Sequence, residues 1–327
     1  MKISDFLIMT VTYGDRFGEL SSGPLAVAES LGCKIVVVCN GISDNYRHKL
    51  NEYIKTTSVD VKFIFNDVNL GSSGGFYAGI EYCSYLSFGW VLILDDDNLV
   101  CSESIRDIDE SKLGVASFMS RKGRRYMEVA IDGCDPTPYL SENGAFLGLS
   151  VLQQIKKRFQ TKNKKLILEK YNFPWSPYGG LLLRIEALTS GIRPNKDYFL
   201  YCDDTEYTNK LSKMFGLYLI PGCKIEDLSD SWNVSGNKNV IDRLLQEKEG
   251  WRVYYSVRNQ CNFDLSRANS TVFFIFNGLI FVSILSLFSL FNFVKKKDVH
   301  YISRYKLIVG AVWQGLRGHL GNKGINW

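Results

Sequence analysis

The sequence predicts an α/β fold in which helices cover both faces of a mostly parallel sheet. Short runs rich in Val, Ile, Leu and Phe alternate with longer segments through the first hundred residues, and each run is about the length of a strand. Such alternation is typical of βαβ units, whose parallel strands are buried on both faces. The 327 residues are 46% hydrophobic and 22% charged, which is ordinary for a folded chain with a large core.

The expected elements follow in chain order. Strands are predicted at 6–13, 34–40, 61–66 and 90–95, with helices at 16–31, 44–56 and 72–88. Further strands are expected at 113–120 and 126–131, a basic helix at 151–165, and a loop at 174–180. We expect a first domain over residues 1–228, a polar linker or lid over 229–266, and an apolar and basic helical region over 267–327.

Charge and cysteine content exclude several classes of function. The net charge of +5 is modest and does not indicate a nucleic-acid partner, which would require a clustered basic stripe. The eight cysteines are scattered singly and there are three histidines, which argues against a structural zinc site or a disulfide framework. The apolar run at 6–11 is too short for a signal peptide, so we expect a reduced, cytosolic protein that is not exported.

Polar side chains follow four successive predicted strands. Ligands of parallel sheets bind outside the carboxyl ends of the strands. Polar residues at four successive strand ends are therefore stronger evidence for a ligand site than any one of them alone. The residues at these ends are Thr12, Tyr13, Arg16, Asn40, Asp44, Asn69, Gly71, Asp95, Asp96 and Asp97.

Asp95, Asp96 and Asp97 form the first acidic cluster, directly after an apolar strand. Adjacent carboxylates repel one another unless a cation offsets their charge. A Mg²⁺ or Mn²⁺ ion bound to a nucleotide diphosphate would supply that charge, with one or two carboxylates as ligands. A solvated acidic turn before a helix near Ser102 is the alternative, and the buried strand before the cluster favours the metal site.

The segment 69–76, NLGSSGGF, is a glycine-rich turn that opens a helix. Glycines such as Gly71 and Gly75 allow close backbone approach, and a helix N-terminus favours anions. The signal is weak, because the spacing is neither the dinucleotide fingerprint nor a P-loop.

Asp203, Asp204 and Glu206 form a second acidic cluster, over a hundred residues after the first. A glycosyl transfer with inversion needs one carboxylate to take the proton of the acceptor hydroxyl, while the charge of the leaving group is neutralised separately. Two separate acidic clusters fit that division. The cluster could equally cap a helix, and both interpretations can hold together.

As an ordered set, these motifs resemble family 2 glycosyltransferases with the GT-A fold, and most closely bacterial galactofuranosyltransferases. The resemblance covers about residues 5 to 260. It rests on Thr12-Tyr13, the N-x-G-x-x-G-G-F turn, the W-x-x-x-L-D-D-D strand, the D-D-x-E segment, and Trp251-Arg252-x-Tyr254-Tyr255-x-x-Arg258-Asn259.

The resemblance implies a role for each matching residue. Asp95 and Asp97 would hold the metal ion and the donor ribose, with Asp96 near the transferred sugar. Asp204 would be the general base beside Asp203, and Glu206 would contact an acceptor hydroxyl. Trp175 would stack on an acceptor ring, although simple packing within its loop explains this residue equally well. The donor pocket would be lined by Thr12, Tyr13, Arg16, Asn40, Asp44, Asn69, Gly71 and Gly75.

One departure from the family pattern concerns the metal ligands. The family usually has a histidine ligand shortly after a Pro-Gly turn, and the segment 221–227 of this chain contains no histidine. Asp227 falls at about that position and could serve as an oxygen ligand.

The segment 272–294 is apolar and long enough to span a bilayer, and Lys295, Lys296 and Lys297 follow it. A single span would place these lysines on the opposite side of the membrane from the nucleotide-sugar domain, although both are expected in the cytoplasm. We therefore expect a monotopic or re-entrant attachment to anionic lipid at the cytoplasmic face of a bacterial membrane. A helix buried against the GT-A domain or a partner subunit is the alternative, and a single span comes third.

The function expected from these features is an inverting, metal-dependent transfer of a hexose from a UDP-sugar to a glycan or lipid-linked glycan. Galactofuranose is the expected sugar. A rhamnosyl- or glucosyltransferase of the same fold, a non-catalytic nucleotide-sugar-binding subunit of a polysaccharide assembly complex, and a nucleotidyltransferase are the alternatives. The last fits poorly, because residues 12–16 do not form its Gly-rich basic loop.

Overall fold

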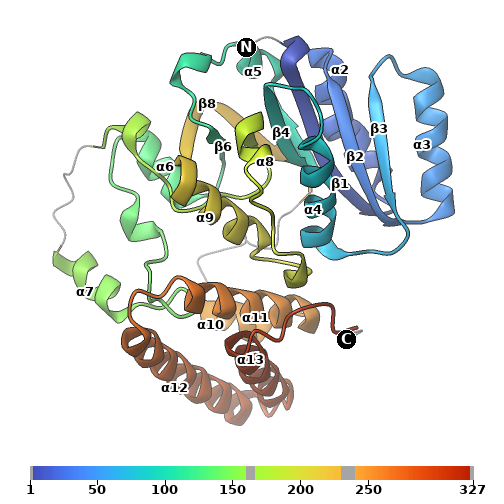
Figure 1. Cartoon of the computed structure of the whole chain (residues 1–327). Helices are drawn as coiled ribbons and strands as arrows, with labels where there is room; N and C mark the ends of the chain where they lie inside the picture. Colours follow the sequence, from blue (N-terminus) through green and yellow to red (C-terminus); the bar gives the residue numbers. More distant parts are fainter. Residues whose placement is uncertain (1–2, 160–165, 230–239, 325–327) are drawn as a thin grey trace. The chain divides into compact units, whose positions relative to one another are not determined.

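The computed structural model describes residues 3–159, 166–229 and 240–324, in two compact units (Figure 1). The first, here called the sheet unit, comprises Met1–Cys134, Lys165–Lys196 and Asp203–Val234. The second, the helical unit, comprises Asp135–Lys164, Asp197–Cys202 and Ser235–Trp327. The division differs from the predicted one, because two insertions from the first 228 residues join the C-terminal helices.

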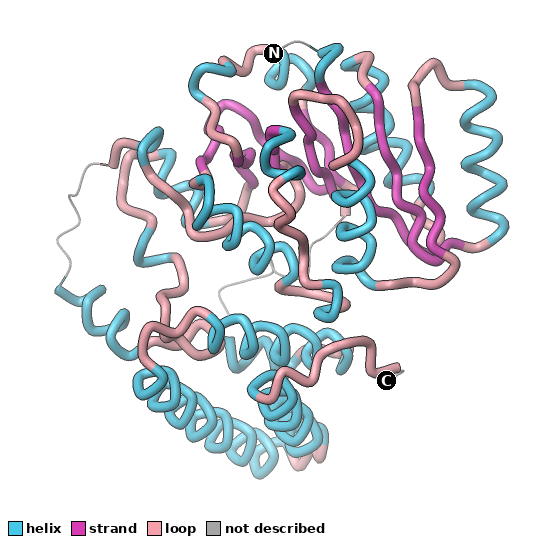
Figure 2. Tube along the Cα trace, in the orientation of Figure 1, coloured by secondary structure: helices cyan, strands magenta, loops and turns pink. Residues whose placement is uncertain are grey.

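The sheet unit is built on an eight-stranded sheet in the order β3-β2-β1-β4-β7-β6-β8-β5. Figure 2 shows the strands of this sheet in magenta. β1 to β4 pair in parallel, as predicted, whereas β7 is antiparallel to both β4 and β6, and β5 is antiparallel to β8. The α/β class is therefore confirmed, with a mixed sheet. The strands are β1 (Phe6–Gly14), β2 (Lys34–Ile42), β3 (Val61–Asn66), β4 (Trp90–Asp95), β5 (Asn98–Val100), β6 (Ala116–Arg121), β7 (Leu181–Arg184) and β8 (Tyr218–Asp227).

Helices flank this sheet. They are α1 (Phe17–Leu20), α2 (Ala26–Leu31), α3 (Asp44–Thr56), α4 (Gly71–Cys83), α5 (Ser102–Arg106), α6 (Arg125–Ile131), α8 (Ile185–Thr189) and α9 (Asp203–Phe215). The single helix predicted at 16–31 is interrupted, because Pro24 has no N–H and Gly23 leaves helical geometry (φ −98°, ψ −108°). A Cβ on Gly23 would lie 2.8 Å from the Asn98 carbonyl oxygen, so only glycine fits at this break.

The strand predicted at 126–131 is wrong, since these residues form α6. Its buried residues are Tyr126, Met127, Val129 and Ala130, a spacing that places them on one helical face. A short apolar run fits either structure when only its composition is known.

The helical unit contains α7 (Val151–Phe159), α10 (Val240–Gln246), α11 (Gly250–Ser266), α12 (Thr271–Lys296) and α13 (His300–Leu316). Its core includes Phe146, Phe274, Phe281, Leu285 and Ile308. The predicted helix at 151–165 is confirmed as far as Phe159, while residues 160–165 lie outside the described part, as do residues 230–239 of the predicted linker.

α12 is long and apolar enough to cross a membrane by length and composition, and 28% of its most apolar stretch is buried. Two of the polar residues that interrupt it, Asn277 and Ser289, are buried within its own unit. Asn277 Nδ2 donates to the Gly144 carbonyl at 2.8 Å, and Asn277 Oδ1 accepts from the Val151 amide at 3.1 Å. Ser289 is likewise buried, whereas Ser283 is exposed, so the outer face of α12 is mainly apolar.

Candidate active site

Asp96, at the end of β4, is held by two groups from the end of β1. The Thr12 hydroxyl donates to Asp96 Oδ2 at 3.0 Å, and Arg16 Nε donates to the same oxygen at 2.9 Å. The Tyr46 hydroxyl lies 2.9 Å from Thr12 Oγ1 and completes the chain. Burial raises the pKa of Asp96 to about 6 against the opposing effect of Arg16. Thr12 and Asp96 are thus buried and paired with each other.

Asp95 and Asp227 share one buried cation, the guanidinium of Arg121 at the end of β6. Arg121 Nη2 lies 3.2 Å from Asp95 Oδ2 and 3.3 Å from Asp227 Oδ1. Burial raises the pKa of both carboxyl groups, and the charge of Arg121 opposes that rise. Arg121 therefore offsets part of the repulsion that the sequence pattern implied.

Asn98 brings Asp97 and Asp227 together. Its Nδ2 donates to Asp227 Oδ1 at 2.9 Å and lies 3.4 Å from Asp97 Oδ1, while its Oδ1 accepts from Arg121. Asp97 also accepts from Arg16 Nη2 at 3.2 Å and from the Ser229 hydroxyl. The predicted proximity of Asp227 to the first acidic cluster is therefore found in the structure.

Gly179 covers this cluster with bare backbone. A Cβ at this position would lie 2.1 Å from Asn98 Oδ1, 2.2 Å from Arg121 Nη2 and 2.7 Å from Asp95 Oδ2. The predicted loop at 174–180 can approach the cluster this closely only because residue 179 is glycine.

The second acidic cluster lies in the first turn of α9. Asp203 is buried and accepts from the Ser72 hydroxyl at 3.0 and 3.1 Å. Burial, and then the neighbouring carboxylate of Asp204, raise the pKa of Asp203 well above its usual value. Burial also raises the pKa of Asp204, whose Oδ1 accepts from the backbone and hydroxyl of Thr205.

The two acidic clusters are near enough to repel each other. The charge of Asp204 contributes to the raised pKa of Asp95, and the charge of Asp95 contributes to that of Asp203. Residues separated by over a hundred positions therefore form one electrostatically connected group in the sheet unit.

Glu206 and Trp175 are each partly engaged within the protein. Glu206 Oε1 pairs with Lys210 Nζ at 2.5 Å, and its other oxygen is buried with no hydrogen-bond partner in the described part of the chain. Trp175 packs edge-on against Tyr126 with ring centroids 5.2 Å apart. Glu206 thus keeps a vacant acceptor atom, while Trp175 has a packing partner of its own.

Asn40 does not fit the predicted donor contact. Its Nδ2 donates to Asn69 Oδ1 and the Gly71 carbonyl, and its Oδ1 accepts from Asn66 Nδ2 and the Leu70 amide. This buried amide has no hydrogen-bonding group left for a ligand. Asn40 instead fixes the turn that begins α4.

The glycine-rich turn also has a structural role, because it lets α4 begin and pack closely on the sheet. Gly71 has φ +74°, and a Cβ on Gly75 would lie 2.5 Å from Val11 Cγ1, so Gly75 lets α4 pack closely on the sheet. The turn reaches the site through Ser72, which binds Asp203. Gly75 was predicted to line the donor pocket, and the contact found for it in the structure is close packing on Val11.

Tyr13 and Asp44 remain available for a ligand. The Tyr13 ring is 49% exposed, with the Arg16 guanidinium 5.4 Å from its centroid. Asp44 is exposed in the first turn of α3, where Ser43 provides the cap.

Sequence reasoning missed three residues of this site: Arg121, Gly179 and Arg124. Arg124 precedes α6, and its positive charge opposes the rise that burial causes in the pKa of Asp204 and Asp227. Its Nε is buried without a hydrogen-bond partner among the described residues. Three basic residues follow the strand predicted at 113–120, in the segment Arg121-Lys122-Gly123-Arg124, and this signal could have indicated Arg121 and Arg124.

The donor atoms suit Mg²⁺ or Mn²⁺ in kind, because Asp97 and Asp227 present hard oxygen ligands side by side. No group of three or more His, Cys, Asp or Glu side chains is arranged around a common metal position in residues 3–159, 166–229 and 240–324. Arg121 lies 3.2 Å from Asp95 and 3.3 Å from Asp227, and Arg16 contacts Asp97, so each of the three predicted ligands is paired with an arginine. Asn98 holds Asp97 and Asp227 together, an arrangement that suits an ion shared by carboxylates and a ligand's phosphates.

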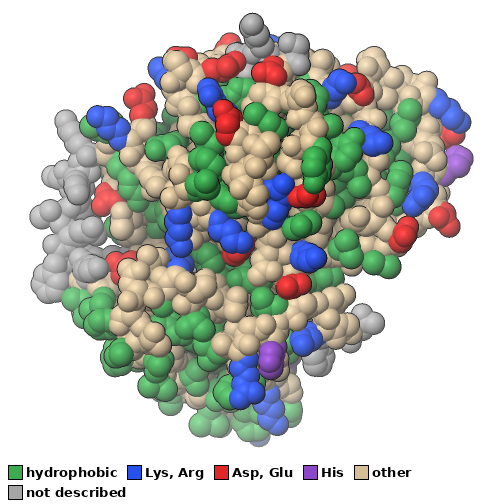
Figure 3. Space-filling model, in the orientation of Figure 1, with side chains coloured by type: hydrophobic (Ala, Val, Ile, Leu, Met, Phe, Trp, Pro, Cys, Tyr) green, Lys and Arg blue, Asp and Glu red, His purple; other side chains and the backbone are tan. Residues whose placement is uncertain are grey.

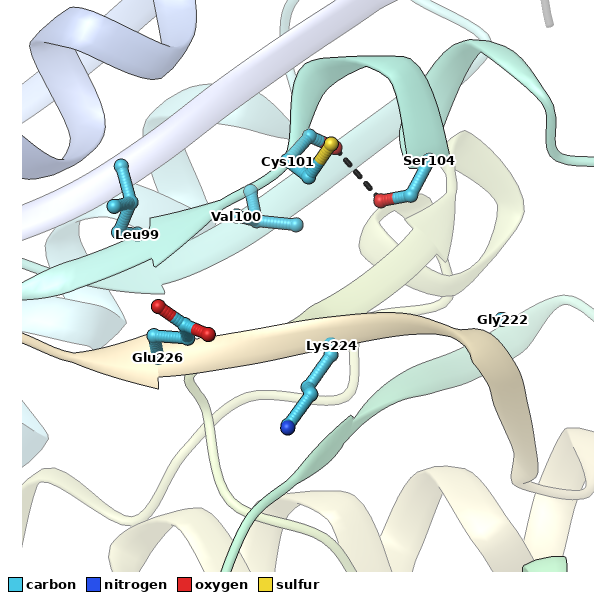
Figure 4. A pocket seen from close by; sticks show the side chains of 7 residues that line it. All are labelled: Leu99, Val100, Cys101, Ser104, Gly222, Lys224 and Glu226. Atoms are coloured by element: carbon cyan, nitrogen blue, oxygen red, sulfur yellow. Dashed lines mark hydrogen bonds between the residues drawn. The ribbon is translucent and has the colours of Figure 1, made fainter.

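A separate pocket of 320 Å³ lies between β5, α5 and β8 (Figure 4). The residues that line it include Cys101, Lys224 and Glu226, and the Ser104 hydroxyl donates to the Cys101 carbonyl at 2.7 Å. Lys224 and Glu226 are exposed and alternate along β8 with the buried Ile225 and the partly buried Asp227. None of the residues of the two acidic clusters lines this pocket.

The fold and the site define a class of protein. The family model described as glycosyl transferase family 2 matches residues 25–108, which include β2 to α5 and the first acidic cluster. The protein is an enzyme, a glycosyltransferase of the hexosyltransferase kind with a GT-A-like α/β fold.

Solved structures of two proteins are similar to this chain at low identity. The crystal structure of S. aureus TarS 1–349 in complex with UDP-GlcNAc is 11% identical, with a TM-score of 0.48. The match covers 95% of this chain and 81% of the TarS chain. The structure of GalNAc-T7 with UDP, GalNAc and Mn²⁺ is 12% identical, with a TM-score of 0.47, and the match covers 84% of this chain and 55% of the GalNAc-T7 chain. No curated protein sequence matches the chain. These likenesses are too low to transfer a substrate.

Proposed function

We propose that the sheet unit transfers a hexose, with inversion, from a UDP-sugar to a hydroxyl group of a glycan acceptor. The observation that carries the proposal is the meeting of two acidic clusters in which burial raises carboxyl pKa values. One cluster would meet the charged donor, and the other would accept a proton. Perturbed carboxyl groups gathered in this way are typical of active sites.

In the proposed step, the acceptor oxygen bonds to the anomeric carbon as the bond from that carbon to the diphosphate breaks. The diphosphate keeps the electron pair of that bond, and the acceptor proton passes to the carboxylate of Asp204. Its raised pKa makes Asp204 a stronger base than an ordinary carboxylate. Glu206 would orient the acceptor, since its unpartnered Oε2 can accept from a second hydroxyl.

The cations of the site divide between structure and ligand. Arg16 and Arg121 are committed to carboxylates, whereas Arg124 would take up charge on the departing diphosphate. Asp97 and Asp227 would hold a Mg²⁺ or Mn²⁺ ion, which neutralises diphosphate charge when it is bound. Tyr13, with its exposed ring, would stack on the donor base.

A donor panel tests this function. Purified protein would be incubated with UDP-galactofuranose, other UDP-hexoses and dTDP-rhamnose, each with Mn²⁺ or Mg²⁺, and nucleotide release measured. We expect release from a UDP-hexose, with UDP-galactofuranose preferred because of the motif resemblance. Release from dTDP-rhamnose alone would instead support the rhamnosyltransferase, and release from no donor would oppose the proposal.

We also propose that α12 lies in the plane of the cytoplasmic membrane surface and attaches the enzyme to anionic lipid. Hydrophobic side chains gather over this part of the helical unit, with lysine and arginine nearby (Figure 3). α13 packs against α12 and carries Arg304 and Lys306, which disfavours burial of the pair across a bilayer. The exposed apolar residues of α12 are Val272, Phe273, Ile275, Phe276, Leu279, Leu287, Phe288, Leu290, Phe291 and Val294.

Vesicle flotation checks this attachment. The protein is expected to float with vesicles containing anionic lipid and less with neutral ones, because Lys295–Lys297 follow the apolar face. The double substitution Leu279→Glu and Phe291→Glu should reduce binding at least about tenfold, since each charge must be desolvated on insertion. Met214→Glu is the matched control, since Met214 is 61% exposed in the sheet unit and Leu279 and Phe291 are 65% and 62% exposed.

Absence of binding to anionic vesicles would contradict the membrane proposal and favour a partner subunit on the apolar face of α12. Equal flotation of the double variant and the Met214→Glu control would show that α12 is not the attachment. A lipid-linked acceptor would fit attachment, since enzyme and acceptor would then share one surface.

A further inference from the structure

The backbone immediately before α9 has an unusual conformation. Phe199, Tyr201 and Cys202 have φ of +66°, +65° and +65°, in the left-handed region that L-residues other than Asn, Asp and Gly rarely adopt. Each such residue costs about 1 kcal/mol or more, so the conformation persists only where surrounding contacts impose it. The segment runs directly into Asp203 and Asp204.

Asn259, on α11, imposes this conformation through one amide group. Its Nδ2 lies 2.8 Å from the Tyr198 carbonyl oxygen, 2.6 Å from that of Leu200 and 3.0 Å from that of Tyr201. Three carbonyls of an irregular segment therefore converge on a single side chain.

Arg258 strengthens the arrangement from the preceding position. Its Nη2 donates to the Tyr198 carbonyl at 2.9 Å, its Nε donates to Asn259 Oδ1 at 2.9 Å, and its Nη1 donates to the Gly321 carbonyl at 2.7 Å. The Arg258–Asn259 bond fixes the orientation of the Asn259 amide, so that Nδ2 faces the segment.

Both side chains are fully buried, at 0% exposure. Burial lowers the pKa of Arg258, and a hydrogen bond with the Tyr254 side chain opposes that effect. Its other acceptors are carbonyl and amide oxygens, and no carboxylate pairs with it among the described residues. Burying a guanidinium without a carboxylate partner is costly. What the pair accomplishes is a fixed backbone over residues 198–201.

We infer that Asn259 and Arg258 are positioning residues for the proposed catalytic carboxylates Asp203 and Asp204. Cys202 is joined to Asp203 by a peptide bond, so the φ and ψ angles of residues 199–202 set the direction in which the chain enters the first turn of α9. Relaxing them to ordinary values would re-aim the Asp204 carboxylate. The inference rests on the proposed function and assigns a role to the Arg-Asn pair of the segment 251–259.

The test compares Asn259→Ala with Asn277→Ala. Asn277 is an equally suitable buried amide of the helical unit, 4% exposed and bonded to the Gly144 carbonyl and the Val151 amide, but it does not touch residues 198–202. Both variants lose a buried amide with its backbone bonds, so both should lose stability. Only Asn259→Ala should disturb the approach to α9.

Three measurements separate positioning from general destabilisation. Hydrogen exchange of the amides of residues 199–205 should rise in Asn259→Ala and stay unchanged in Asn277→Ala. The kcat for nucleotide release should fall about 10- to 100-fold in Asn259→Ala alone, since a displacement of about 1 Å can cost that much, while the Kd of UDP changes less than about threefold. The acid limb of its pH profile should move to lower pH, because a carboxyl group released from burial regains a lower pKa.

Each outcome decides a separate point. If the amides of residues 199–205 exchange equally fast in the two variants, Asn259 does not hold the backbone of residues 198–201, whether or not the enzyme is active. If exchange rises in Asn259→Ala while its kcat and pH profile stay unchanged, Asn259 holds this backbone but does not position the carboxylates, and the inference is overturned. If neither the unmodified protein nor Asn277→Ala releases nucleotide, the result counts against the proposed function. The exchange measurement would then decide only whether Asn259 holds the backbone of residues 198–201.

Discussion

Replacing Asp204 with asparagine is expected to lower nucleotide release and transfer by about 10²- to 10⁴-fold, the range for loss of a general base. The amide has nearly the same shape but cannot take the acceptor proton. The Kd of UDP should stay within a few-fold of that of the unmodified protein, because the proposed donor contacts lie at the ends of β1, β4 and β8. Steady-state kinetics and calorimetry would be compared for the two proteins.

The pH profile of the unmodified enzyme adds a second check on Asp204. Since burial raises the pKa of this carboxyl group, activity should fall on the acid side at a higher pH than an ordinary aspartate would give. Glu206→Gln is the companion variant and should raise the acceptor KM more than it lowers kcat. Full activity of Asp204→Asn would remove Asp204 from the role of base.

Replacing Arg121 with methionine is expected to lower the free energy of unfolding by about 2–4 kcal/mol near pH 7.5, because two partly buried carboxylates lose their shared cation. Burial already raises the pKa of Asp95 and Asp227, and removal of Arg121 raises them further. A raised folded-state pKa gives stability at low pH that is lost as pH rises through it. The deficit of the variant should therefore shrink towards pH 5, as followed by chemical denaturation.

Arg193→Met is the matched control for this prediction. Arg193 is also largely buried and pairs with Glu81 at 2.5 Å, and Arg193 lowers the pKa of that carboxyl group. The stability from such a group is present above its unfolded pKa, so the deficit of the control should stay constant between pH 5 and 7.5. A deficit in Arg121→Met that is equally constant would mean that Arg121 does not hold the acidic cluster together.

The parallel half of the sheet could be predicted from sequence because its signals are local. β3 and β4 begin and end where predicted, and β1 and β2 differ by one or two residues at one end. β1, β2 and β4 contain continuous apolar runs that reflect burial on both faces, whereas β3 lies at the edge of the sheet and is only partly buried. α6 was mistaken for a strand because a run of seven residues is too short to reveal a period.

The candidate site was predictable only in part. The carboxylates could be found because acidic residues at strand ends are rare and costly, whereas the contribution of Arg121 depends on pairing between distant strands. Asn40 and Gly75 show the converse, since polar and small residues at strand ends can be consumed by the turn they stabilise. Sequence pattern reveals which residues lie at an edge, and the contacts reveal which of them are free.

The most direct test of the central claim is a calorimetric titration of UDP into the protein, with Mg²⁺ or Mn²⁺ and with a chelator. If the carboxylates at the end of β4 bind a divalent ion that also binds the diphosphate, UDP should bind at least about tenfold more tightly with the ion than without it. Asp97→Ala should abolish that difference. Absence of UDP binding under every condition, or unaltered ion-dependent binding in Asp97→Ala, would contradict the claim.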